Sequence, residues 1–398
     1  MTALDREVAA RVRRHGPLHL DEVLDLALYD PERGFYGSGA GAAGRGRDFL
    51  TAPEVGPLFG AVVARALDAW WRGLGSPDPF TVVEAAAGVG TLARTVLLAE
   101  PDCLGALTYV LVERSPVLRR RQADHLPLVD PALAFPPGAF ADDDDHDFAS
   151  GASGSGVVDA GRGPRLVSLP DLPALRVTGV VLANELLDNL AFRLLERRDG
   201  GWLEVRVGVE SARGGDDPRP FEVLVAAGPA DADLADRLAP DAAVGARLPV
   251  QRAATAWVTA ALERLERGRL VVFDYAATGP ELAARPWDEW VRTYRAQQRG
   301  GALLDELGHQ DVTCEVDELQ LELARRPDAV TSQVEFLTAH GIEELVAEGR
   351  RLWTERAHIG DLDALRARSR VGEAEALLDP DGFGAFRVLQ WQVEPASA

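Results

Sequence analysis

A strand that runs directly into a glycine turn and a helix is the feature that most limits the possible folds of this chain. Residues 80–84 (FTVVE) are largely apolar and β-branched, and AAAGVGTLARTVLLAE follows without a break. The glycines at 88 and 90 allow a tight turn, and the helix after them presents free backbone N–H groups. A second strand, residues 107–113 (LTYVLVE), comes next. Strand, glycine turn, helix and strand in this order indicate a parallel α/β unit.

Further strand and helix patterns extend this unit into a larger sheet. Short apolar runs at 166–169, 177–183 and 270–275 are typical of strands, and apolar residues at helical spacing cover 251–267. The stretch 192–209 predicts a hairpin that turns at Asp199 and Gly200. We therefore predict an α/β protein with a mostly parallel, doubly wound sheet, an N-terminal helical segment and an added smaller lobe.

The same patterns suggest four consecutive parts of the chain. We expect N-terminal helices and a glycine-rich cleft loop over 1–75, a cofactor-binding domain over 76–275 that contains the hairpin, an added substrate lobe over 276–345, and a C-terminal helix with a final strand over 346–398. Within the first part, Thr51 and Glu54 have the spacing of a helix capping box, with Pro53 early in the helix.

Composition excludes several classes of function. The formal net charge of −21 disfavours binding to nucleic acid, which depends on clustered cations. Two cysteines are too few for a disulfide framework. No stretch reaches about 18 uninterrupted apolar residues, and the N-terminus has no apolar core of a signal peptide, so we expect no membrane insertion and a cytoplasmic location. Acidic residues 142–147 are expected to be a solvated loop, and no metal site is expected.

The glycine turn and the acid after the second strand predict a bound nucleotide-like cofactor. Glu113 lies 23 residues after Gly90 and could accept hydrogen bonds from both hydroxyls of a ribose. A dinucleotide and S-adenosylmethionine both fit this pattern, and a packing turn followed by a solvated glutamate would also produce it. Glu84 ends the first strand directly below the turn. Because a carboxylate there would repel a pyrophosphate and suit a cation, Glu84 favours the sulfonium cofactor.

Six stretches of the chain together resemble a known family. They are LYDPERGFYGSG, GRDFLTAPEVGPLFG, VVEAAAGVGTLA, VVLANELLDNL, GHQDVT and EFLTAHGI, spread in order over about residues 20–345. They resemble the MidA-type methyltransferases, which are similar to the mitochondrial complex I assembly factor that dimethylates an arginine of a core subunit. The resemblance implies a class I methyltransferase (Rossmann-like) fold, S-adenosyl-L-methionine as methyl donor, and a protein arginine as acceptor.

The resemblance also implies roles for individual residues. It assigns to the cofactor site Glu84, Ala86, Gly88, Gly90, Glu113, Asn184, Gly46, Asp48, Phe49, Thr51, Pro53 and Glu54. It places Glu185 and Asp188 where the acceptor approaches, and Gly308, Asp311 and Thr313 in a motif of the added lobe. Ala86 stands where the family usually has glycine, and a family histidine is replaced near Gln297.

Carboxylates beside the cofactor would suit an arginine acceptor. The guanidinium has a pKa above about 12, so it is protonated at neutral pH. Its nitrogen becomes a good nucleophile only when a proton is displaced. Carboxylates can grip the guanidinium and take the proton. Glu185 and Asp188 are three residues apart and could share one face of a helical turn, with Glu185 as the clamp and Asp188 supporting it. Alternatively, Asn184 and Glu185 cap the next helix.

The sequence therefore predicts a SAM-dependent methyltransferase that acts on a protein arginine. The resemblance makes a respiratory NADH dehydrogenase subunit the first acceptor to test. Two alternatives stay open: methylation of a small molecule through the same site, and a catalytically weak assembly chaperone that binds a partner subunit. Ala86 and the replaced histidine keep the chaperone in view.

Overall fold

A seven-stranded sheet forms the centre of the larger part of the molecule. The computed structural model describes residues 2–38, 50–135, 163–210, 219–296 and 298–395. The strands lie in the order β16-β17-β10-β5-β2-β3-β4. Their bounds are β2 Phe80–Ala85, β3 Leu107–Val112, β4 Arg165–Leu169, β5 Val177–Asn184, β10 Leu265–Asp274, β16 Ala329–Ser332 and β17 Arg387–Val393. Five neighbouring strands, β4 to β10, are parallel, and β17 runs antiparallel to both β10 and β16.

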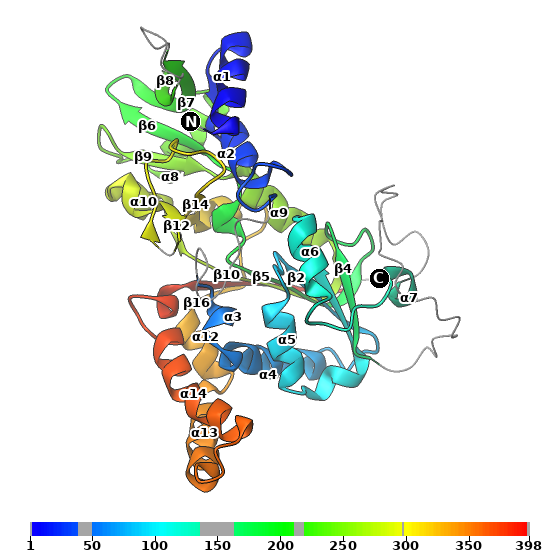
Figure 1. Cartoon of the computed structure of the whole chain (residues 1–398). Helices are drawn as coiled ribbons and strands as arrows, with labels where there is room; N and C mark the ends of the chain where they lie inside the picture. Colours follow the sequence, from blue (N-terminus) through cyan, green and yellow to red (C-terminus); the bar gives the residue numbers. More distant parts are fainter. Residues whose placement is uncertain (1, 39–49, 136–162, 211–218, 297, 396–398) are drawn as a thin grey trace.

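Helices cover both faces of this sheet, as expected from the sequence (Figure 1). One face packs against α4 Pro57–Gly73, α5 Thr91–Leu98, α12 Gln333–Ala339, α13 Ile342–Arg356 and α14 Leu362–Leu377. The other face packs against α7 Pro131–Ala134, α9 Arg252–Glu263 and α11 Glu318–Leu321. Every residue of β2 and β3 is buried, because a parallel strand covered on both sides has no solvent face.

A second, antiparallel sheet forms the smaller lobe. Its strands are β1 Leu18–His19, β6 Arg193–Arg198, β7 Gly201–Glu210, β8 Arg219–Ala226 and β9 Arg247–Val250. β6 and β7 form the hairpin, with Arg198 paired to Gly201 across the turn. The helices of this lobe are α1 Ala3–His15, α2 Leu20–Tyr29, α8 Pro229–Leu238 and α10 Gly279–Ala284.

The remaining elements are short. They are α3 Ala52–Val55, α6 Pro116–Gln122, β11 Ala276–Ala277, β12 Val291–Arg295, β13 Gln298–Arg299, β14 Asp311–Cys314, β15 Val316–Asp317, and the 3-10 turns η1 Asp102–Ala106, η2 Leu187–Asn189, η3 Trp287–Glu289 and η4 Phe383–Ala385. β12, β13 and β14 form a small sheet, and β12 and β14 pack in the smaller lobe.

The core of the smaller lobe draws on three separate stretches of chain. Its buried apolar residues lie within 4–35, 192–250 and 282–314. The sequence had placed the added lobe at 276–345 as one continuous stretch. Instead, β16 pairs with β17 in the main sheet, and Phe336 of α12 packs in the main core. The N-terminal helices belong to the smaller lobe, because their apolar faces cover its sheet.

The cleft between the two parts follows from this arrangement. The carboxyl ends of β2, β3, β5 and β10 lie at the edge of the main sheet that faces the smaller lobe (Figure 1). In open parallel sheets, ligands bind outside the carboxyl ends of the strands, where the strand order reverses. Here the order reverses between β2 and β5.

Candidate functional site

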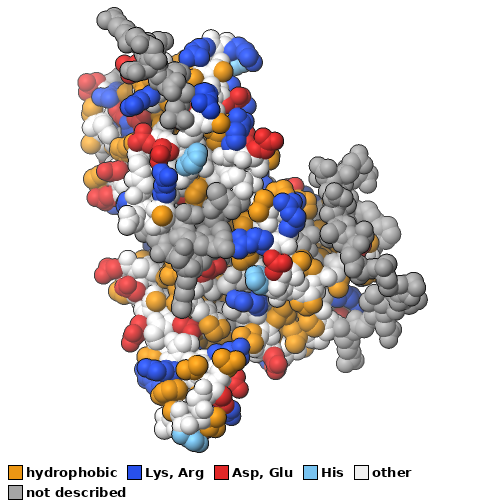
Figure 2. Space-filling view, viewed as in Figure 1, with side chains coloured by type: hydrophobic (Ala, Val, Ile, Leu, Met, Phe, Trp, Pro, Cys, Tyr) orange, Lys and Arg blue, Asp and Glu red, His pale blue; other side chains and the backbone are white. Residues whose placement is uncertain are grey.

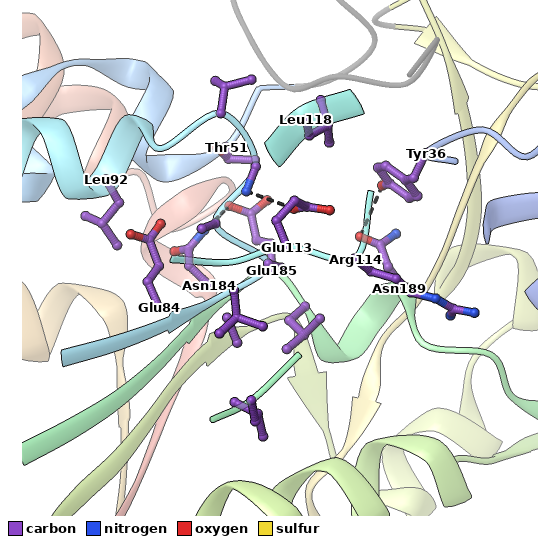
Figure 3. A pocket seen from close by; sticks show the side chains of 18 of the residues that line it. Tyr36, Thr51, Glu84, Leu92, Glu113, Arg114, Leu118, Asn184, Glu185 and Asn189 are labelled. Atoms are coloured by element: carbon purple, nitrogen blue, oxygen red, sulfur yellow. Dashed lines mark hydrogen bonds between the residues drawn. The ribbon is translucent and has the colours of Figure 1, made fainter. Parts of the chain in front are cut away.

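A cavity of about 490 Å³ opens at this edge of the sheet. Glu84, Glu113 and Asn184, each at a strand end, line one side of it, and Tyr29 and Tyr36 line it from the smaller lobe. Figure 3 shows Glu113 and Glu185 close together, with Glu84 on one side of them and Tyr36 on the other. The cavity therefore has a wall from each part of the molecule.

The glycine turn after β2 has the backbone shape that only glycine adopts freely. Gly88 and Gly90 have φ of +54° and +84°, and Gly90 caps α5. A Cβ at Gly88 would meet nothing within 4 Å, so its backbone faces the cleft openly. A Cβ at Gly90 would lie 2.6 Å from the side chain of Leu126. Gly88 thus leaves room for a close approach to its backbone, and Gly90 packs against Leu126.

Ala86 adopts the same left-handed conformation, with φ of +55°, and its side chain is exposed. The turn therefore forms although this position has alanine where the family usually has glycine. Left-handed backbone costs a non-glycine residue about 1–2 kcal/mol. That strain is stored at the edge of the cleft.

Ala86→Gly is expected to raise the free energy of unfolding by up to about 1 kcal/mol, because relief of strain exceeds the extra entropy of the unfolded glycine. Cofactor affinity should stay within about threefold, since Ala86 already forms the turn. Thermal unfolding and calorimetric titration with S-adenosylhomocysteine measure both quantities. A lower melting temperature would show that the alanine methyl group stabilises the turn through packing.

Glu84 is a buried carboxyl directly below the turn. Its side chain is 5% exposed, and Oε2 accepts a hydrogen bond from the Tyr109 hydroxyl at 2.7 Å. Burial raises the pKa of Glu84 to about 8, although the Tyr109 hydroxyl and the Ala93 backbone N–H lower it. A cation bound beside Glu84 would favour its charged form.

Glu113 joins the end of β3 to the glycine turn. Oε2 accepts the Gly88 N–H at 2.9 Å, and Oε1 accepts the Ser115 N–H at 2.8 Å. Burial raises the pKa of Glu113, and the two N–H donors oppose that shift. Because each carboxylate oxygen has a second lone pair, Glu113 can still accept a ligand hydroxyl.

Glu185 follows β5 in a strained conformation, with φ of +52°. Its Oε1 accepts two hydrogen bonds, from the Ala52 N–H at 3.1 Å and from Asn184 Nδ2 at 2.9 Å. Burial raises the pKa of Glu185 to about 8, and those two donors lower it. Both structural bonds use one oxygen, so Oε2 is the oxygen available to a ligand in the cleft (Figure 3).

Asn184 Oδ1 is buried and has no hydrogen-bond partner in the described part of the chain. Asn184 also lines the cavity. A buried acceptor without a donor costs free energy, and a ligand donor in the cleft would satisfy it. The uncovered backbone of Gly88 and the Asn184 acceptor together suit a cofactor that packs closely against the turn and carries N–H or O–H donors.

Asp188 does not share the cleft face with Glu185, contrary to the expectation from their spacing. Residues 187–189 form a 3-10 turn rather than an α-helix, and Asp188 is 3% exposed and outside the cavity lining. Burial and the neighbouring Asp274 hold the pKa of Asp188 well above its usual range. Asp274 accepts the N–H groups of Leu187 and Tyr275 at 2.8 and 2.9 Å, so these acids support the turn from inside.

The expected N-terminal motif reaches the cleft, but the capping box does not form. Thr51, Pro53 and Glu54 line the cavity. The side chain of Thr51 makes no capping hydrogen bond to α3, and Glu54 Oε1 instead accepts one from Thr91 Oγ1 of α5 at 3.1 Å. The expected site residues Gly46, Asp48 and Phe49, and Gln297, lie outside the described residues.

Asp311 is the residue of the added-lobe motif that reaches the site. Its Oδ1 accepts hydrogen bonds from the Tyr36 hydroxyl at 2.9 Å and from Asn189 Nδ2 at 3.1 Å. Gly308, with φ of +86°, packs against the backbone of Arg33, and Thr313 lies within β14. Tyr36 and Asn189 line the cavity, so Asp311 fixes the wall that the smaller lobe contributes.

Sequence reasoning missed four further residues of the site. Tyr36 and Asn189 lie within the quoted motifs, but nothing local marks them as partners. Gln122 donates from Nε2 to the Gly88 carbonyl at 2.8 Å and accepts from Ser168 of β4, so it fixes the turn from a distant helix. Asp171 lies two residues after the end of β4 and lines the cavity. An acid close to the end of a strand is the signal that pointed to Glu113, and it could also have pointed to Asp171.

Within the described ranges, no group of three or more His, Cys, Asp or Glu side chains is placed to hold a metal ion. None of the helices in those ranges is long and apolar enough to cross a membrane.

The family model that matches this chain decides its family. It is described as "Putative S-adenosyl-L-methionine-dependent methyltransferase" and matches residues 62–334, more than half of the chain. The chain belongs to this methyltransferase family. Membership confirms the expected family, with S-adenosylmethionine as its cofactor.

Curated relatives carry a more specific name. The Drosophila melanogaster protein named protein arginine methyltransferase NDUFAF7 homolog, mitochondrial, is 33% identical over 214 residues, which cover 53% of this chain and 46% of that protein. The Danio rerio protein arginine methyltransferase NDUFAF7, mitochondrial, is 27% identical over 210 residues, covering 52% and 46%. The matched region thus spans about half the length of these relatives.

Solved structures of other proteins confirm the fold. A Burkholderia thailandensis protein bound to S-adenosyl-homocysteine has 25% identity and a TM-score of 0.73, covering 100% of this methyltransferase and 93% of that chain. A native crystal structure from the same organism gives 24% identity, a TM-score of 0.74 and the same coverage. The Rossmann-like, doubly wound architecture expected from the sequence is therefore confirmed.

Proposed function

We propose that this protein transfers a methyl group from S-adenosylmethionine to an arginine side chain of a protein. The observation that carries the proposal is the placement of Glu185. Its carboxyl lines the cleft between the glycine turn and the smaller lobe, and one of its oxygens, Oε1, accepts both structural hydrogen bonds. The names of the curated relatives support the same substrate class.

The cofactor side of the cleft would be held by the strand ends. S-adenosylmethionine, when bound, supplies a methyl group on a positively charged sulfur. Glu113 would accept the ribose hydroxyls, Glu84 would face the positive charge of the methionine portion, and Gly88 would allow close approach. Asp171 would accept from the adenine amino group, and Asn184 Oδ1 would accept a ligand N–H.

Glu185 would make the acceptor nitrogen reactive. Oε2 would accept an N–H of the guanidinium and localise its positive charge on the other nitrogens. As the nitrogen forms a bond to the methyl carbon, the bond from carbon to sulfur breaks and the nitrogen proton passes to Glu185. Holding the reacting atoms in line is itself worth several kcal/mol.

The acidic surroundings of Glu185 would favour a cationic acceptor. Asp274 and Asp311 lie close enough to Glu185 to raise its pKa. A guanidinium entering the cleft relieves that repulsion, whereas a neutral acceptor does not. Tyr36 would line its path from the smaller lobe.

A protein partner is part of this proposal. We propose a respiratory NADH dehydrogenase subunit of the same organism as the first acceptor to test. We also propose that the reaction takes place in the cytoplasm, although the names of the curated relatives include "mitochondrial". Binding of nucleic acid remains disfavoured by the net charge of −21.

The test is transfer of labelled methyl groups to that subunit. The purified protein, incubated with methyl-labelled S-adenosylmethionine and the subunit, should place one or two labelled methyl groups on one arginine. A subunit in which that arginine is replaced by lysine should stay unlabelled. Label on a small molecule would favour the small-molecule alternative. Binding of the subunit without transfer would favour an assembly chaperone.

A further inference from the structure

Glu373 of α14 is a buried acid at the junction between α3 and α4. Its side chain is 5% exposed, and Oε2 accepts the Leu58 N–H of α4 at 2.8 Å. Oε1 accepts a hydrogen bond from Ser369, one turn earlier on the same helix. In the described part of the chain it forms no ion pair with an arginine or histidine. A buried carboxyl without a cation partner calls for a specific role.

The first role of Glu373 is to cap α4 from outside that helix. α4 begins at Pro57, which has no N–H, and its N-cap Gly56 provides no side chain. Leu58 therefore carries the first free N–H of the helix, and Glu373 accepts it. A carboxylate at a helix N-terminus is also favoured by the helix dipole.

Gly56 leaves the space that Glu373 fills. A Cβ on Gly56 would lie 2.5 and 2.6 Å from the two carboxylate oxygens of Glu373. The three nearest atoms to that Cβ all belong to Glu373. The backbone between α3 and α4 is therefore held directly against this carboxyl.

The same junction positions two contacts of the active cleft. α3 ends at Val55, next to Gly56. At its other end the Ala52 N–H donates to Glu185 Oε1 at 3.1 Å, and between them Glu54 accepts from Thr91 of the cofactor-binding helix α5 at 3.1 Å. Because α3 is a single turn, a shift at Gly56 moves both contacts.

We propose that Glu373 is a positioning residue for the methyl-transfer site: by capping α4 it fixes α3, and α3 in turn holds Glu185. This inference rests on the proposed function only for its effect on turnover.

α13 and α14 form an arm that projects from the main body, and arginine and apolar side chains lie together on its surface (Figure 2). α14 packs against α3 and α4 (Figure 1), and Glu373 contacts Leu58 of α4.

The main test compares three variants on α14. Glu373→Ala removes the acceptor, Glu373→Gln keeps an oxygen for the Leu58 N–H, and Glu375→Ala changes an exposed acid two residues away. Amide hydrogen exchange of residues 50–58, the dissociation constant of S-adenosylhomocysteine, and turnover as a function of pH are measured for each.

Only Glu373→Ala should disturb the cleft. We expect at least about tenfold faster exchange in residues 50–58, turnover lower by about tenfold to 100-fold, and ligand affinity within about threefold. Since the Ala52 N–H lowers the pKa of Glu185, the acid limb of its turnover profile should also move to higher pH. Glu373→Gln and Glu375→Ala should match the wild type.

A double-mutant cycle tests the contact without needing an acceptor. Gly56→Ala alone should raise exchange in residues 50–58, because the new methyl group displaces the carboxyl. In the Glu373→Ala background the methyl group has room, so Gly56→Ala should add little. Additive effects, unchanged exchange in Glu373→Ala, or faster exchange with wild-type turnover would each overturn the proposal. If no acceptor is ever methylated, the proposed function fails, and the exchange data still decide the role of Glu373.

Discussion

Replacing Glu185 with glutamine is expected to lower methyl transfer by at least about 100-fold, the scale of losing a general base. Oε1 accepts both structural hydrogen bonds, from the Ala52 N–H and Asn184 Nδ2, and a glutamine oxygen can accept the same two. The change therefore falls on Oε2, which would lose its charge and its ability to take a proton. Affinity for S-adenosylhomocysteine should stay within about threefold.

Asp188→Asn is the matched control for this change. It also converts an acid to an amide in the same turn, but Asp188 is buried and lies outside the cavity lining, so it does not face the acceptor. We expect turnover within about fivefold of the wild type. Wild-type turnover in Glu185→Gln would remove Glu185 from its assigned role. Equal losses of turnover in the two variants would show that both substitutions act by disturbing the fold of the turn.

The backbone of Glu185 supports a functional reading of that residue. A φ of +52° at a glutamate costs about 1–2 kcal/mol, and such strain concentrates at functional sites. Glycine at this position would remove the strain. The chain instead keeps a carboxyl there and secures it with the Ala52 N–H.

The parts of the site that could be predicted from sequence are those built by neighbouring residues. The glycine turn, Glu84 and Glu113 each stand at the end of a strand, and the strand pattern alone sends all three to one edge of the sheet. The spacing of Glu185 and Asp188 was misleading, because a 3-10 turn at 187–189 places Asp188 in the interior. A spacing rule applies only where the helix it assumes exists.

Long-range contacts account for what sequence reasoning missed. Gln122 reaches the Gly88 carbonyl across 34 residues, and Glu373 reaches the Leu58 N–H across 315. Neither belongs to a recognisable local pattern, since each is one of several polar residues on its helix. The smaller lobe was misplaced for the same reason: its core joins the separate stretches 4–35, 192–250 and 282–314, and only packing shows which stretches meet.

The second large effect concerns Glu84 and the pH dependence of cofactor binding. Burial raises the pKa of Glu84 to about 8, so the carboxyl is protonated at pH 6. S-adenosylmethionine carries a positive sulfonium and an ammonium group, which favour the carboxylate. Binding must therefore release a proton, and affinity should rise by about tenfold per pH unit from pH 6 toward 8 and then level off.

The stability of the free protein should change in the opposite direction. Because the folded pKa of about 8 lies above the ordinary value of 4.5, the native state holds a proton that the unfolded state has lost between these values. Stability contributed by the protonated form is fully present below pH 4.5 and is lost as the pH rises through 8. Glu84→Gln removes this dependence, since its side chain stays neutral and can still accept from Tyr109.

Glu84→Gln therefore separates the two effects. At pH 8.5 the variant should melt at a higher temperature than the wild type and bind S-adenosylmethionine about tenfold to 100-fold more weakly, whereas at pH 6 the two proteins should bind alike within a few-fold. Calorimetric titrations in buffers of different ionisation enthalpy count the released proton directly. Glu185 also has a pKa of about 8 and lines the same cavity, so Glu185→Gln is measured alongside. Proton release that persists in Glu84→Gln and disappears in Glu185→Gln would assign the linkage to the acceptor side of the cleft and contradict the proposed contact of Glu84 with the cationic portion of the cofactor.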